Sequence, residues 1–185
     1  MIVAIKEKDK VVLGVSICDA CIDMTDKDLA HPDNLPLRKL RGTKDCYMAM
    51  DTISLLTDAL RYNDSLYKDF DDQMSIIENL VSVTKKLCKV ISPYFNNKEM
   101  ENRMVIVKDN RLYSVDSFFN VWEVDDFLAT TYDDYYMAAF ETMKDLSNED
   151  KIVEVSRKIE RLKNRKLFPM TILDTSTGKK KVYYK

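Results

Sequence analysis

Glycine is scarce in this chain: the 185 residues contain only Gly14, Gly42 and Gly178. Phosphate-binding loops need several glycines close together so that the backbone can approach the ligand, and the sequence therefore excludes that class of site. Long apolar runs are also missing, since no stretch reaches the roughly 18 residues that span a bilayer. The first residues include the charged Lys6 and Glu7 instead of an apolar signal segment. We therefore expect an intracellular, cytoplasmic protein that does not enter a membrane.

The formal net charge of -2 conceals an asymmetry between two consecutive stretches. Residues 116–150 contain ten acidic residues and one basic residue, whereas residues 151–185 contain eleven basic and three acidic residues. Blocks of opposite charge can steer a protein partner or a second copy of the chain, or can be two solvated helix faces. The basic stretch 157–166 has no interleaved aromatic residues and the chain is slightly acidic overall. Nucleic-acid binding is therefore not expected.

The residue patterns predict one domain over residues 1–185, in which strands and helices come in grouped runs. Strands are predicted at 2–7, 11–16, 37–40, 46–49, 104–107, 112–115, 120–124, 170–173 and 181–184, helices at 51–70, 73–92, 132–146 and 149–164, and a loop at 18–35. Ser147 and Asp150 have the spacing of a capping box. The helix that follows is predicted to bury Ile152, Val155, Ile159 and Leu162. Grouped runs favour a layered α+β domain over a doubly wound one.

Several short strings, taken in order, resemble the proteasome β subunit and its bacterial relative HslV. They are Val3–Lys6 followed by Val11–Gly14, then Arg111–Asp116, Tyr135–Glu141 and Pro169–Asp174. The resemblance implies the N-terminal-nucleophile hydrolase fold, a four-layer αββα sandwich. One predicted helix pair would cover each face of the paired sheets. Members of this family form rings through their helix layers, so the resemblance also implies a homo-oligomer.

The residues that carry out the reaction of this family are largely missing. That reaction uses a threonine at the start of the first strand, whose hydroxyl is the nucleophile and whose amine is the base. Here the first strand begins with Met1 and Ile2. Ser16 stands in place of a catalytic aspartate, Lys39 is the candidate match for the family lysine, and Thr131 keeps one hydroxyl of a Gly-Ser-Gly string. Ser16, Lys39 and Thr131 are thus candidates for a vestigial pocket.

These departures favour a catalytically degenerate subunit that acts as an assembly or scaffold protein, without a cofactor. Two alternatives stay open. The first is a hydrolase of the same fold with a non-standard nucleophile, such as Ser16 or Cys18. The second is a thiol-dependent or zinc-dependent binding module, with Cys18, Cys21, His31 and Cys46 as zinc ligands. Because the chain is expected to be intracellular, we expect its cysteines to be free thiols.

Overall fold

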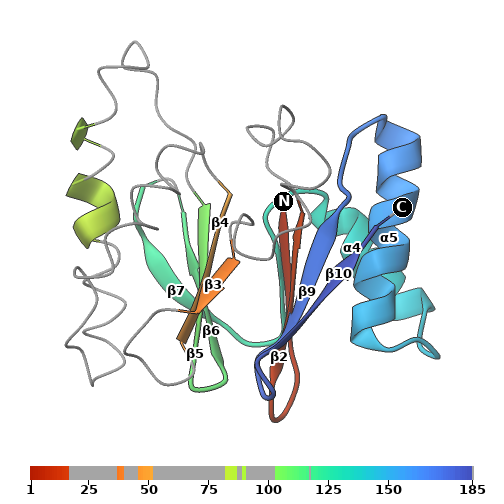
Figure 1. Cartoon of the computed structure of the whole chain (residues 1–185), viewed down its shortest axis with the longest axis horizontal. Coiled ribbons are helices and arrows are strands. Elements are labelled where there is room, and N and C mark those ends of the chain that lie inside the picture. The colour runs from red at the N-terminus through yellow and green to blue at the C-terminus, as the bar shows by residue number, and fades with distance from the viewer. Residues whose placement is uncertain are drawn as a thin grey trace.

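The computed structural model describes residues 1–16, 37–39, 46–51, 82–86, 89–90, 103–116 and 118–184. These residues form two five-stranded antiparallel sheets that pack face to face (Figure 1). Sheet A has the strand order β10-β9-β2-β1-β8, and sheet B has the order β3-β4-β5-β6-β7. The strands of sheet A are β1 (Ile2–Lys6), β2 (Val11–Ser16), β8 (Phe127–Ala129), β9 (Met170–Asp174) and β10 (Lys179–Tyr183). Those of sheet B are β3 (Leu37–Lys39), β4 (Cys46–Asp51), β5 (Arg103–Lys108), β6 (Arg111–Val115) and β7 (Val121–Val124).

Helices lie on both outer faces of the paired sheets. Helices α4 (Asp133–Thr142) and α5 (Asn148–Lys163) cover sheet A, and the helical residues 82–86 and 89–90 lie on the far side of sheet B (Figure 1). The four-layer αββα arrangement predicted from the sequence is therefore confirmed. The predicted helix at 51–70 and loop at 18–35 fall almost entirely outside the described residues. No helix in the described part of the chain has the length and apolar character needed to cross a membrane.

Two apolar cores explain why the sequences of β1 and β2 are nearly unbroken runs of hydrophobic residues. Alternate side chains of both strands point in opposite directions, and both directions are buried. Ile2, Ala4, Leu13 and Val15 join the core between the two sheets. Val3, Ile5 and Val12 join the second core, between sheet A and the helices. A strand covered on both faces has no need for polar alternation.

Helix α5 begins as the capping box predicts. The Ser147 hydroxyl accepts a hydrogen bond from the Asp150 backbone N–H at 3.1 Å, which satisfies one of the free donors of the first turn. The predicted apolar face is confirmed for Ile152, Val155 and Ile159, which are buried. The prediction is wrong for Leu162, whose side chain is 69% exposed. Residues 161–166 are all exposed, so the last turn of the helix lies beyond the core that covers the earlier turns.

Helix α4 is shorter than predicted. Tyr132 has a left-handed backbone conformation, with a φ of 61°, and so stands outside the helix as its N-cap. At the other end Met143 leaves the helical conformation, and its N–H donates to the Ala139 carbonyl. The helix therefore spans Asp133–Thr142 instead of 132–146. Asp133 and Asp134 occupy the first turn, where negative charge interacts favourably with the helix dipole.

Candidate functional site at the start of β1

The main chain at the start of β1 is held from two sides. On the β2 side, both the backbone N–H and the hydroxyl of Ser16 donate to the Met1 carbonyl, at 3.0 and 3.3 Å. On the β8 side, the Thr130 N–H donates to the Ile2 carbonyl at 2.9 Å. The Ile2 N–H in turn donates to the Thr130 hydroxyl at 2.9 Å. Ser16 and Thr130 therefore fix the backbone at the position where the resemblance to the proteasome β subunit and HslV would place a catalytic threonine.

The side chains at this position pack as core residues. Met1 is 7% exposed and belongs to the cluster between sheet A and the helices, whereas Ile2 is fully buried between the sheets. The Tyr136 hydroxyl contacts the Met1 sulfur at 3.4 Å and lies 2.7 Å from the hydroxyl of Ser156. Burial raises the pKa of Tyr136 well above its usual value, so the phenol stays neutral. The strand start is thus tied to both α4 and α5.

Sheet B reaches the same end of the sandwich through Arg103. Its guanidinium, at the start of β5, donates a hydrogen bond to the Thr130 carbonyl. Thr130 therefore contacts β1 through its N–H and hydroxyl, and sheet B through its carbonyl. Thr130 consequently links the two sheets at the strand start.

Of the three predicted pocket residues, two have described side chains, and one of these two contacts the start of β1. Ser16 is there, 1% exposed. Thr131 is exposed, and the adjacent Thr130 supplies the hydroxyl that contacts β1. Lys39 lies in β3, where its backbone pairs with Tyr47, and its side chain is outside the described set. The sequence reasoning missed Thr130 because it did not predict β8, which sets the register of the residues that follow it.

The zinc hypothesis stays a prediction. Cys18, Cys21 and His31 lie outside the described residues, and Cys46 is placed by its backbone as the first residue of β4. Within the described ranges, no three histidine, cysteine, aspartate or glutamate side chains come together to bind a metal ion.

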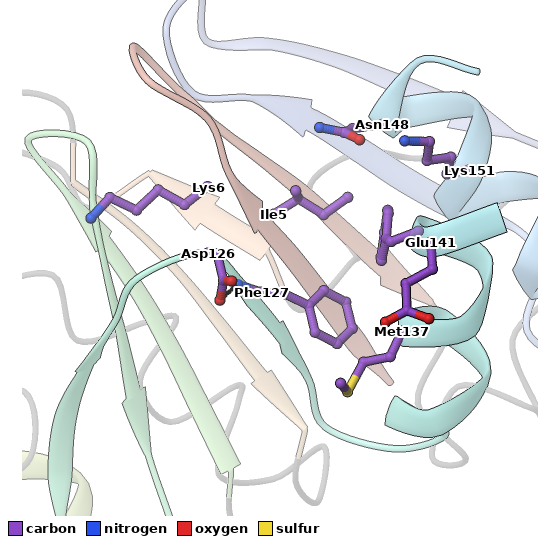
Figure 2. A pocket seen from close by; sticks show the side chains of 9 residues that line it. Ile5, Lys6, Asp126, Phe127, Met137, Glu141, Asn148 and Lys151 are labelled. Atoms are coloured by element: carbon purple, nitrogen blue, oxygen red, sulfur yellow. Dashed lines mark hydrogen bonds between the residues drawn. The ribbon is translucent and has the colours of Figure 1, made fainter. Parts of the chain in front are cut away.

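A separate pocket of about 450 Å³ lies at the opposite end of β1 (Figure 2). It is lined by Ile5, Lys6, Asp126, Phe127, Met137, Phe140, Glu141, Asn148 and Lys151. The Phe127 and Phe140 rings pack with their centroids 5.1 Å apart. Figure 2 shows Phe127, Met137 and Glu141 grouped on the α4 side, whereas Lys6 extends away from them. The pocket thus combines an apolar floor with charged groups at its edge.

The chain is similar to several solved structures in its fold. The sequence matches no protein-family model and no curated protein. A solved complex of BPH from Thiobacillus denitrificans with epoxomicin is 11% identical, with a TM-score of 0.64 over 94% of this chain and 96% of that one. HslV from Trypanosoma brucei is 11% identical, with a TM-score of 0.54 over 94% and 97%. A helical assembly of the Anbu complex from Pseudomonas aeruginosa is 14% identical, with a TM-score of 0.63 over 100% and 86%.

The two-sheet sandwich and these similarities define the class of fold. The chain has the fold of the N-terminal-nucleophile hydrolases. Within that class it has the proteasome-like and HslV-like form, as the sequence strings predicted. At 11–14% identity the likeness to these structures is a likeness of fold.

Proposed function

We propose that this chain is a single-domain, proteasome-like subunit that acts through assembly, as a scaffold, and not through terminal-threonine catalysis. The observation that carries the proposal is the packing of Met1 and Ile2 at the start of β1. The reaction of the fold family needs a hydroxyl nucleophile with a neighbouring amine at the start of this strand. Here those positions hold a thioether and an aliphatic side chain, both buried in the two cores.

The geometry of Ser16 argues against this residue as the nucleophile of a hydrolase, whereas Cys18, the other candidate, lies outside the described residues. A serine nucleophile must lie about 3–3.5 Å from the substrate carbonyl and must be open to it. Ser16 is buried, and its hydroxyl donates to the Met1 carbonyl. Thr130 is buried as well, and its hydroxyl accepts the Ile2 N–H. Both hydroxyls therefore act on the backbone of β1, which supports a structural role for them.

The absence of terminal-threonine chemistry can be tested with epoxomicin. We expect the intact mass of the protein to stay unchanged after incubation with excess inhibitor, because no hydroxyl nucleophile stands at the start of β1. Intact-protein mass spectrometry is the measurement. The BPH from Thiobacillus denitrificans, whose solved complex contains epoxomicin, is the positive control. A stoichiometric adduct that maps to the first residues of this chain would refute the proposal.

Self-association is the second part of the proposal. The Anbu complex from Pseudomonas aeruginosa, which shares the fold, forms a helical assembly. In this chain the acidic 116–150 stretch and the basic 151–185 stretch are well suited to a charge-complementary contact between copies.

We expect light scattering coupled to size exclusion to give a mass above one chain at micromolar concentration. Raising the salt from about 0.05 M to 0.5 M should weaken the assembly only in part, because apolar burial supplies most of the affinity and the Debye length is roughly 8 Å at 0.15 M. A mass of one chain in both salts would contradict the scaffold proposal. Complete dissociation of the assembly at about 0.5 M salt would contradict the expectation that apolar burial supplies most of the affinity.

A further inference from the structure

The two outer edges of sheet A carry opposite charge. At one edge, β10 presents Lys179, Lys180 and Lys181, which are all exposed. At the other edge, β8 follows directly after the exposed Asp125 and Asp126. Among the described residues, no strand pairs with the outer side of either edge. Opposite charge on opposite edges of one sheet is the arrangement that lets copies of a chain meet head to tail.

The register of sheet A places these edges at the same level. One continuous row of paired residues crosses the sheet, formed by Lys179, Asp174, Val12, Ile5 and Phe127. The next two rows place Lys180 level with Leu128, and Lys181 level with Ala129. A second copy placed next to the first in the direction across the strands, and rotated to follow the twist of the sheet, would thus bring its lysine edge against the β8 edge of the first.

The pocket beside β8 has the chemistry that suits a lysine side chain. Its apolar floor of Ile5, Phe127 and Phe140 can cover the methylene stem, while the aromatic faces favour an ammonium group. Asp126 and Glu141 add carboxylates at the edge of the pocket. Glu141 has no ion pair within the described part of the chain, and neither has Lys179.

Two cations of the pocket itself have contacts of their own. The Lys6 ammonium lies 3.7 Å from the Glu123 carboxylate on the sheet B side. The Lys151 ammonium lies 5.6 Å from the centroid of the Phe140 ring. The Lys151 contact shows that a lysine ammonium already packs against one of the rings of this pocket.

We propose that the β10 edge of one copy docks against the β8 edge of the next, with the Lys179 side chain directed into the Phe127–Phe140 pocket. The occupant of the pocket is thus a second copy of this chain. The inference rests on the proposed self-association and names the surfaces that produce it. The contact joins two different surfaces, so it repeats from copy to copy and gives a closed ring or a helical filament. Lysines on an edge strand can instead serve only to prevent edge pairing, and the experiment distinguishes the two roles.

The test exchanges the charges at the contact with two single variants, Lys179→Glu and Glu141→Lys. The mass of the full chain and of each variant is measured by light scattering coupled to size exclusion. Each single variant places like charges together at the contact, and we expect the dissociation constant to rise about tenfold or more. An equimolar mixture of the two variants, or a single chain carrying both substitutions, restores opposite charges at the contact and should recover the wild-type assembly. Lys158→Glu, on the exposed face of α5 outside both edges, is the matched control and should leave the assembly unchanged.

The melting temperature of each variant establishes that it is folded, and both substitutions lie at exposed positions. A wild-type assembly that neither single variant weakens would overturn the edge contact while leaving self-association intact. So would single variants that dissociate but do not recover in the mixture or in the doubly substituted chain. A wild-type protein of one-chain mass would overturn self-association itself.

Discussion

Replacing Tyr136 with alanine is expected to lower the free energy of unfolding by about 3–5 kcal/mol, the range for loss of a large buried aromatic side chain. Tyr136 is fully buried in the core between sheet A and the helices. Its hydroxyl joins α4 to Ser156 of α5 and contacts the Met1 sulfur at the start of β1. The substitution therefore removes packing and a polar link among three elements at once. Urea denaturation followed by circular dichroism measures the loss.

Two companion variants separate the contributions at this position. Tyr136→Phe keeps the ring and removes the hydroxyl, so it should cost about 1 kcal/mol, the usual value of one hydrogen bond. Tyr135→Ala is the matched control on the same helix. Its side chain is 39% exposed, and it should cost less than about 1 kcal/mol. A loss for Tyr136→Ala no greater than that for Tyr135→Ala would contradict the packing described for α4.

The parts of the fold that were predictable from the sequence are those set by local pattern. The apolar runs of β1 and β2 are visible because both faces of each strand are buried. The start of α5 is visible because Ser147 and Asp150 meet within one turn of the chain. The order of the family-like strings then indicates the sandwich, which no single string specifies. The local patterns and the order of the strings were together sufficient to predict the four layers of the αββα sandwich.

The candidate site was less predictable because contacts distant in sequence define it. Thr130 meets Ile2 across 128 positions, through the short strand β8, which has too few residues to show a periodic pattern. The choice between Thr130 and Thr131 depends on the register of β8 against β1, which the sequence does not reveal. The end of α5 was difficult to predict for the same reason, because it depends on contacts with other parts of the chain. Leu162 continues the apolar spacing of the helix, but whether it is buried depends on how far the core extends.

Introducing a side chain at Gly14 is expected to produce the second large effect. Gly14 lies on β2 beneath α5, and a Cβ atom at this position would lie 2.7 Å from Cγ2 of Ile152 and 3.1 Å from Cδ1 of Ile172. Both distances are shorter than ordinary contacts between carbon atoms, so the Ile152 side chain or α5 would have to shift, and the Ile172 side chain would have to give way. Gly14→Val should cost about 3 kcal/mol in unfolding free energy, and Gly14→Ala about 1–2 kcal/mol, as in overpacked cores.

A double-mutant cycle assigns this cost to the helix contact. Ile152→Ala alone should destabilise by about 2–5 kcal/mol, because it leaves a cavity under α5. In that background the added methyl of Gly14→Ala has room, so its cost should fall by about 1–2 kcal/mol. Gly178→Ala, in the exposed β9–β10 turn at a φ of 67°, is the control and should cost the same in both backgrounds. An unchanged cost for Gly14→Ala would place the clash away from Ile152. A reduced cost means that Ile152 of α5 occupies the space above Gly14 that a side chain on β2 would otherwise fill.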